Sequence, residues 1–214
     1  VDSLGNTVSE EVTFEFDPAV GDFTFTVFIE GNKEMATQGD LLEFDIYGLE
    51  EDEHVLQMYG LSALGTFTDT TVIDTVDAGY FEEVQAAETI YRASLTLATA
   101  IAGNHQVTAE VADEAGNVAS RYVTVKVDVT APVVTVSTDK DYYKNGDRME
   151  IYAVVEELNV NTVIGDLSAL NLGDDVAFMQ VAESDTFMYV VQSLPNLADA
   201  DYEIIVTATD LAGN

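Results

Sequence analysis

The strongest constraint on the fold is a five-residue motif that occurs three times along the chain. Residues 113–117 read Asp-Glu-Ala-Gly-Asn, and residues 210–214 read Asp-Leu-Ala-Gly-Asn. A weaker copy at residues 2–6 reads Asp-Ser-Leu-Gly-Asn. The final asparagines are 111 (117 − 6) and 97 (214 − 117) residues apart. A period near 100 residues is typical of one β-sandwich domain, so the sequence predicts a tandem array and not a single globular enzyme.

The segments on both sides of each motif alternate between apolar and polar residues, which is typical of β-strands. The copies at 113–117 and 210–214 are preceded by residues 106–113 and 202–210. The copies at 2–6 and 113–117 are followed by residues 12–17 and 123–128. Each motif is therefore predicted to be a hairpin turn, in which Gly supplies a positive φ and the Asp caps the turn. We expect this capping role for Asp113 and Asp210.

Further repeated segments fix the register of the array. Gly39-Asp40 recurs as Gly146-Asp147, and Leu-Ser-Ala-Leu occurs at residues 61–64 and again at 167–170. No segment has a sustained helical period. The alternation predicts core positions at Leu42, Phe44, Ile46, Val107, Val111, Val123, Val125, Met149, Ile151, Ile204, Val206 and Ala208. It predicts that their neighbours face water, namely Glu43, Asp45, Glu110, Lys126, Glu150 and Glu203.

Residues 202–214 resemble the penultimate strand and turn of bacterial and archaeal Ig-like repeats of surface proteins. Residues 123–132, which end in Val-Asp-Val-Thr-Ala-Pro, resemble the last strand and linker of the same repeats. The resemblance implies an all-β fold of tandem immunoglobulin-like β-sandwiches, as in S-layer proteins and adhesins. The first repeat departs from the pattern, because His105 stands where the second repeat has Tyr202 and because residues 66–88 form a long insertion.

The repeats divide the chain into three parts. Residues 1–17 match the last strand of a preceding or neighbouring Ig-like domain, residues 18–128 form one domain, and residues 129–214 form a second domain without its final strand. Either the sequence is a window of a longer array, or one chain's first strand completes the second domain of another chain. We expect Val12, Phe14 and Phe16 to be the interaction residues of that strand, which implies self-association or contact with neighbouring Ig-like domains.

Charge restricts the partners. Forty Asp and Glu against seven Lys and Arg give a net charge of −33. Such a polyanion repels nucleic-acid phosphates and anionic lipid surfaces, so neither is an expected partner. No apolar run reaches the length of about 18 residues that a membrane-spanning helix needs, so no direct membrane insertion is expected. Adaptation to high salt, attraction of cations and simple solvation of the surface all remain open.

Calcium is the candidate cofactor, because Ca²⁺ prefers several carboxylate and carbonyl oxygens. The candidate ligands lie where loops should converge at domain ends. They are Asp113, Asp128, Glu51, Asp52, Asp174 and Asp175. Glu51 and Asp52 belong to an acidic run at residues 50–53, whose second-repeat counterpart is Glu156 and Glu157. None has EF-hand spacing.

The residues for catalysis are not arranged in a recognisable motif. The chain has no cysteine, and His54 and His105 belong to no metal-binding or nucleophile motif. The expected protein is therefore a non-enzymatic, extracellular cell-surface protein that builds a prokaryotic lattice or filament. The alternatives are an adhesin whose domains space or present a ligand-binding region, and a stalk attached to an enzyme.

Overall fold

The computed structural model describes residues 19–85, 89–182 and 184–214, and its regular structure in these ranges is β-strand apart from four short 3-10 helices. The strands of the first domain are β1 (Thr24–Ile29), β2 (Leu41–Tyr47), β3 (Glu53–Tyr59), β4 (Gly65–Phe67), β5 (Thr75–Asp77), β6 (Glu82–Gln85), β7 (Ile90–Ala100), β8 (Gly103–Asp113) and β9 (Val118–Val127). The strands of the second domain are β10 (Val133–Thr138), β11 (Met149–Glu156), β12 (Val160–Asp166), β13 (Val176–Ala177), β14 (Met179–Gln180), β15 (Thr186–Val191) and β16 (Ile205–Asp210). The 3-10 helices are η1 (Glu30–Asn32), η2 (Leu61–Ala63), η3 (Ala78–Tyr80) and η4 (Ser168–Leu170). The predicted all-β fold is confirmed.

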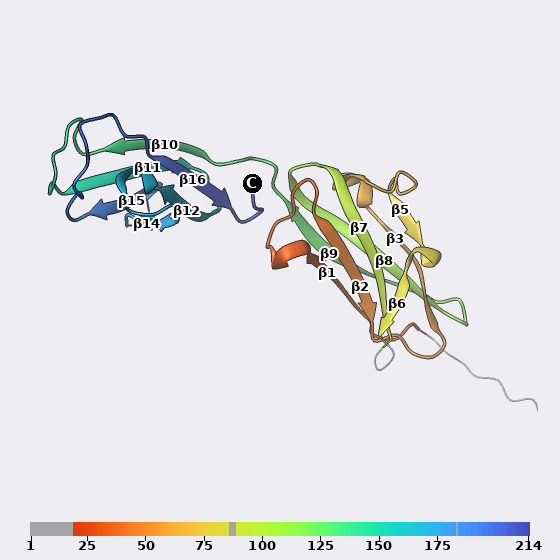
Figure 1. Cartoon of the computed structure of the whole chain (residues 1–214). Helices are drawn as coiled ribbons and strands as arrows, with labels where there is room; N and C mark the ends of the chain where they lie inside the picture. The colour runs from red at the N-terminus through yellow and green to blue at the C-terminus, as the bar shows by residue number, and fades with distance from the viewer. Residues whose placement is uncertain (1–18, 86–88, 183) are drawn as a thin grey trace, which may run out of the picture.

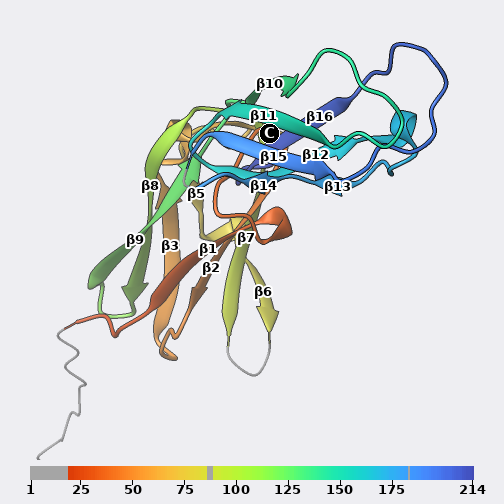
Figure 2. The ribbon, with the colours of Figure 1, turned by 90° about the vertical axis from the view of Figure 1, so that its left-hand side faces the viewer.

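The first domain is a sandwich of two antiparallel sheets. One sheet has the order β1-β2-β7-β4, with β6 also paired to β7, and the other has the order β5-β3-β8-β9. Figure 2 separates them, with β3, β8 and β9 on one side and β6 and β7 on the other. Consecutive strands are divided between the two sheets as in immunoglobulin-like domains. The long insertion supplies β4, β5, η3 and β6, which widen both sheets.

The second domain repeats this plan with fewer strands. Its sheets have the orders β10-β11-β15-β14 and β13-β12-β16. In the first domain β8 lies between β3 and β9, whereas the equivalent strand β16 pairs with β12 and no strand among the described residues covers its other side. This leaves a row of backbone groups open along β16, which is a template for pairing with a further strand.

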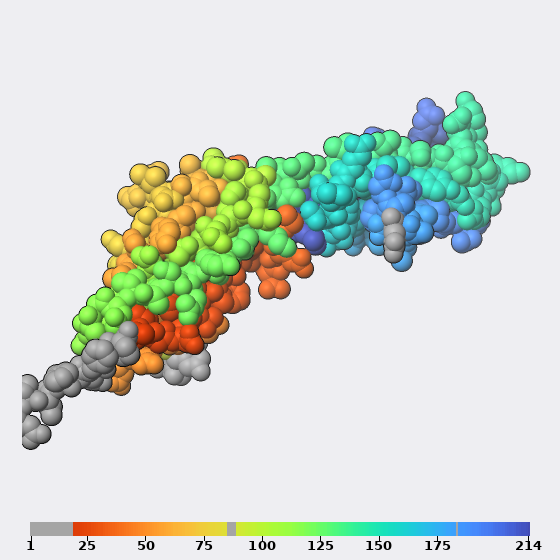
Figure 3. Space-filling model, turned by 180° about the vertical axis from the view of Figure 1, so that it is seen from behind, coloured from red at the N-terminus to blue at the C-terminus, as the bar shows by residue number. Residues whose placement is uncertain are grey.

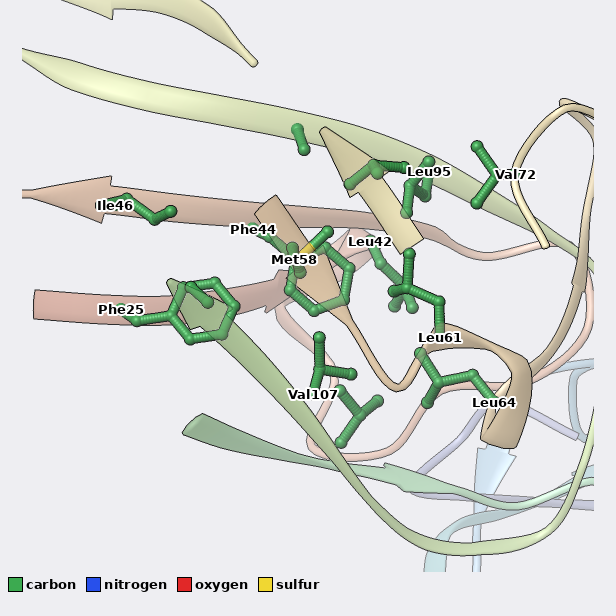
Figure 4. Packing of buried hydrophobic residues seen from close by; sticks show 14 of the residues in the cluster. Phe25, Leu42, Phe44, Ile46, Met58, Leu61, Leu64, Val72, Leu95 and Val107 are labelled. Carbon is green, nitrogen blue, oxygen red and sulfur yellow. The ribbon is translucent and has the colours of Figure 1, made fainter. Parts of the chain in front are cut away.

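Most of the predicted core positions of the first domain are confirmed. Leu42, Phe44 and Ile46 alternate along β2 and are fully buried, and they belong to one cluster with Val107 and Met58 of the facing sheet (Figure 4). The prediction that Asp45 faces water is wrong. Its carboxylate is buried because Arg92 on β7 donates two hydrogen bonds of 2.7 Å to it, which replaces the lost hydration.

The second domain has its own core, built around Met149, Ile151, Leu167 and Leu170. Ile204, Val206 and Ala208 were predicted to be core residues. They pack against this core but are only partly buried, so the prediction overstates their burial. The reason is the open side of β16, which leaves their sheet with three strands. Val123 on β9 of the first domain is likewise only partly buried.

Two correspondences between the repeats have structural explanations. The two Leu-Ser-Ala-Leu segments form η2 and η4, and the leucines at both ends of each segment are buried in the cores of their own domains. His105 and Tyr202 also have equivalent contacts. His105 Nε2 lies 2.7 Å from the carbonyl oxygen of Ile101, and the Tyr202 hydroxyl donates to the carbonyl oxygen of Ala198 at 3.0 Å, in each case four residues upstream. Histidine thus makes the strand-to-corner bond that a tyrosine usually makes in this fold.

The two domains lie end to end (Figure 1). Residues 128–132 connect them, and the end of the second domain that carries residues 210–214 faces the first domain. Within the described ranges, no helix is long and apolar enough to cross a bilayer.

Candidate functional site

The candidate site is the junction between the two domains, and its centre is the turn at residues 210–214. The Asp210 carboxylate is completely buried, and it accepts hydrogen bonds from the backbone N–H groups of Ala212 and Asn214 at 2.8 and 2.9 Å. Its second oxygen accepts from Asn214 Nδ2 at 2.9 Å. Gly213 has a φ of +89°, a conformation that glycine adopts without steric cost. The aspartate therefore organises the turn, as predicted.

The same turn closes β8 and β9 in the first domain. Asn117 donates to Asp113 from its backbone N–H at 2.8 Å and from its side chain at 2.6 Å, and Gly116 also has a φ of +89°. Burial by itself raises the pKa of Asp113, but the hydrogen bonds from Asn117 and its neighbours outweigh burial and lower it. The capping role predicted for Asp113 is confirmed.

Asn214 also ties the second domain to the first. Its side-chain N–H donates to the carbonyl oxygen of Asp128 at 3.1 Å, and its side-chain oxygen accepts from the hydroxyl of Thr37 at 2.8 Å. One amide thus bonds its own turn, the linker and a loop of the first domain. An amide suits this position, since it is the only short side chain with both donors and an acceptor in a fixed plane.

The loop that receives Asn214 is itself anchored. The backbone of Ala36 pairs with the end of β9, accepting from the N–H of Asp128 at 2.9 Å. Lys33 Nζ lies 2.7 Å from the buried carboxylate of Asp40, which also accepts from the backbone N–H of Thr37 at 3.0 Å. The junction therefore joins three fixed segments: the loop at residues 33–40, the start of the linker, and the turn at residues 210–214.

Three carboxylates converge at this junction. Asp128 of the linker, Glu157 between β11 and β12, and Asp210 each place one oxygen within 4.8 Å of the others. Glu157 is held by backbone N–H groups of Leu158 and Asn159, at 2.7 and 3.0 Å from its Oε1. No ion pair from Lys or Arg to these three acids occurs among the described residues. Three carboxylates this close repel one another, and a hard cation with oxygen ligands is the chemical species that relieves this.

Of the six predicted calcium ligands, the structure brings Asp128 into this group, together with Glu157 from the predicted second-repeat counterpart. Glu51 and Asp52 lie between β2 and β3 at the far end of the first domain, in the same region as Asp113. Asp174 and Asp175 are exposed in the loop before β13. Asp210 completes the group, and the sequence predicted it only as the cap of its turn.

The last acid of the acidic run at residues 50–53 is buried at the far end of the first domain. Glu53, the first residue of β3, is 8% exposed and sits opposite Asp113 in the strand register. Its carboxylate accepts from the backbone N–H groups of Gly21 and Glu50. Glu53 thus fastens the entry segment of the domain to the β2–β3 turn. The predicted interaction residues Val12, Phe14 and Phe16 lie outside the described residues.

Comparison with known proteins adds little to this picture. No family model matches the chain, and no curated protein matches it. Among solved structures, the chain is similar to the crystal structure of the titin domains Z1Z2 in complex with telethonin. The sequence identity is 10% and the TM-score 0.31, over 90% of this chain and 96% of that one. At this distance the likeness carries no argument on function, and the Ig-like assignment stands on the strand order of the sheets.

Proposed function

We propose that this chain is a non-enzymatic structural component of a prokaryotic extracellular surface assembly, an S-layer lattice or a filament, built from tandem Ig-like domains. One observation carries this proposal: the two domains are joined end to end by side-chain hydrogen bonds through Asn214 as well as by a linker. Domains in one chain move relative to one another unless their interface restrains them. A bonded junction makes a stiff rod, which is the mechanical property that a lattice or filament subunit needs.

The stiffness can be measured directly. The chain has no cysteine, so the variants Ser120→Cys on β9 and Ser137→Cys on β10 together accept one spin label in each domain, both at exposed positions. We expect a narrow distribution of label-to-label distances by double electron–electron resonance. Asn214→Ala should broaden it, while Asn171→Ala, at an exposed position away from the junction, should not. A broad distribution in the unsubstituted rod would contradict the proposal. Electron microscopy of concentrated protein then tests for ordered sheets or filaments.

We include Ca²⁺ in this proposal, as the ion held by Asp128, Glu157 and Asp210. What supports it is the convergence of three carboxylates on the junction of a chain with a net charge of −33. A bound divalent ion would offset their repulsion and lock the junction, and mass action would stabilise the folded state. We expect millimolar Ca²⁺ to raise the melting temperature more than Na⁺ at equal ionic strength. Glu157→Gln should remove that difference, and Asp174→Asn should retain it. If Ca²⁺ and Na⁺ raise the melting temperature equally, Ca²⁺ is not specifically bound and the acidic surface serves only to solvate the protein.

An adhesin remains the second candidate, and one feature favours it. A groove of about 590 Å³ on the first domain is lined by Glu43, Tyr80, Arg92 and Ser94, among others. The Tyr80 hydroxyl donates to Asp69 at 2.9 Å, and Arg92 holds Asp45 and Glu43, so the polar groups of this groove are fixed in place. An adhesin that uses this groove should bind a surface glycan or protein on an array. That binding should disappear in Ser94→Trp, which fills the groove from an exposed position.

A further inference from the structure

The outer end of the second domain carries a copy of the loop that forms the junction. Lys33 and Asp40 lie at the two ends of that loop, and Lys140 and Asp147 are their equivalents, 107 residues on in each case (140 − 33 and 147 − 40). Both lysines approach their aspartates, at 2.7 and 3.8 Å. The backbone bonds also match, since Gly39 and Gly146 donate to the carbonyl oxygens of equivalent leucines. The second domain therefore presents outward, at residues 140–147, the kind of surface that the first domain presents to the junction.

The outer end of the first domain carries the other half of the junction. Its turn at residues 113–117 has the hydrogen bonds and the glycine conformation of the turn at residues 210–214. The two turns differ in place, because residues 210–214 face the first domain while residues 113–117 lie at the far end of the rod (Figure 1). The two outer ends of the chain are thus the two halves of an interface that the chain already makes once at its centre.

The two outer ends of the chain differ in charge. Three of the seven basic residues of the chain are exposed within residues 140–148, namely Lys140, Lys144 and Arg148. The same segment carries two acids, Asp141 and Asp147, so its formal charge is +1 (3 − 2). The outer end of the first domain is acidic in both of its turns, with Glu50, Glu51, Asp52, Asp113 and Glu114. These two ends are the extremes of the rod seen in Figure 3. In a chain with a net charge of −33, a segment with a positive formal charge is the exception, and this segment is a contact surface suited to an acidic partner.

One aromatic side chain projects from the basic end. Tyr142, in the middle of the 140–147 loop, is 90% exposed. A tyrosine with so little contact in its own chain brings a large apolar ring and a polar hydroxyl to an interface, a combination that is enriched at protein–protein contacts. Lys144 occupies the place of Thr37, the residue that bonds Asn214 at the internal junction (144 − 107 = 37).

We propose that the basic end of the second domain, residues 140–148, docks onto the acidic end of the first domain in a second copy of this chain. The contact is head to tail and does not close on itself, so repeated docking builds a filament of rods. This deepens the proposed structural function by naming the partner and the two surfaces. The docking is compatible with the predicted strand addition. β9 runs from the turn at residues 113–117 to the end of the first domain that meets the second domain. A strand added at the equivalent place on the second domain would therefore run toward that domain's outer end, where the docking occurs.

A charge-swap experiment tests the docking. Variant one carries Lys140→Glu and Lys144→Glu, and variant two carries Glu51→Lys and Glu114→Lys, all at exposed positions. In sedimentation velocity at about 0.15 M salt, where the Debye length is about 8 Å, we expect the unsubstituted chain to associate and each variant to associate at least about tenfold more weakly. A mixture of the two variants should recover the association, since each then offers the charge that the other needs.

Single substitutions provide the matched control. Lys144→Glu at the basic end and Lys126→Glu on the side of β9 change the net charge equally, and only the first should weaken association. Circular-dichroism melts confirm that every variant is folded. A chain that remains monomeric at about 1 mM, equal weakening by the two single variants, or a mixture that fails to recover would each overturn the docking. Association that resists charge reversal but disappears without residues 1–17 would assign it to strand addition instead. A flexible internal junction would count against the structural function itself and leave the docking test unaffected.

Discussion

Removal of the Asp210 carboxylate should destabilise the second domain strongly and the first domain hardly at all. Asp210 is fully buried and accepts three hydrogen bonds, two from backbone N–H groups and one from Asn214 Nδ2. In Asp210→Ala the N–H of Ala212, a residue that is itself fully buried, loses its acceptor. A buried donor without a partner costs about 1–3 kcal/mol, and each bond to a charged group is worth about 1.5–3 kcal/mol.

Because the three bonds share one acceptor and Asn214 is partly solvated, these costs do not add fully, and we expect a loss of about 3–5 kcal/mol in the free energy of unfolding. Domains of this size have a stability of about 5–15 kcal/mol, so the second domain would lose a large part of its stability. The first domain has a separate core and should change by less than about 0.5 kcal/mol.

Hydrogen exchange with mass spectrometry in a denaturant series separates the two domains and suits this measurement. Asp174→Ala is the matched control, since it removes an exposed aspartate from the same domain and should change stability by less than about 0.5 kcal/mol. If Asp210→Ala costs no more than Asp174→Ala, the turn does not depend on its aspartate. If both domains lose stability equally, they unfold as one unit and the assignment of the effect to the turn is wrong.

Three further predictions follow from single positions. Gly65→Ala should lower the melting temperature by circular dichroism far more than Gly39→Ala. Both glycines have a positive φ, but a Cβ on Gly65 would lie 2.1 Å from the carbonyl oxygen of Thr99 and one on Gly39 would meet nothing within 4 Å. Asp113 has a lowered pKa in the folded state, so its contribution to the free energy of unfolding should be complete above its unfolded-state pKa of about 3.9 and should fade as the pH falls below that value. In a denaturation series from about pH 6 to 2, Asp113→Asn should therefore lose less stability in acid than the unsubstituted chain does. Thr37→Val should widen the distance distribution between the two spin-labelled domains without changing the melting temperature of either, because it removes one hydrogen bond between the domains and preserves the side-chain shape.

The sequence was sufficient for the fold because its signals are local and repeated. Alternation along β2 placed Leu42, Phe44 and Ile46 correctly, and the repeated Asp-x-Ala-Gly-Asn motif identified both turns and the role of their aspartates. The error at Asp45 has a physical cause. Its burial depends on Arg92, which lies 47 residues away on a neighbouring strand, and alternation contains no information about such a partner.

The candidate site was predictable only in part, because it forms between segments far apart in the chain. Asp128 was selected as an acid near the linker, but its proximity to Glu157 and Asp210 depends on how the second domain is set against the first. The contact of Thr37 with Asn214 spans 177 residues and has no local signature. One signal was present and was not used: the spacing from Lys33 to Asp40 recurs from Lys140 to Asp147, which identifies the junction loop and its copy.

The repeat of the turn has a consequence for how such a rod grows. In the turn at residues 210–214 the aspartate is satisfied by hydrogen bonds within the turn itself, so the turn does not need the adjoining domain to hold its shape. The Asn214 side chain does more than close the turn, since its oxygen accepts a hydrogen bond from the first domain and its N–H also donates to the linker. The Asp-x-Ala-Gly-Asn turn thus stabilises its own domain and also supplies a side chain that can bond an adjoining domain. When such a domain is repeated along a chain, each copy therefore carries its part of the junction with it. The same property explains why the outer ends of this chain retain both halves of the interface, and why a change at Asn214 should affect stiffness and stability together, whereas a change at Thr37 should affect stiffness alone.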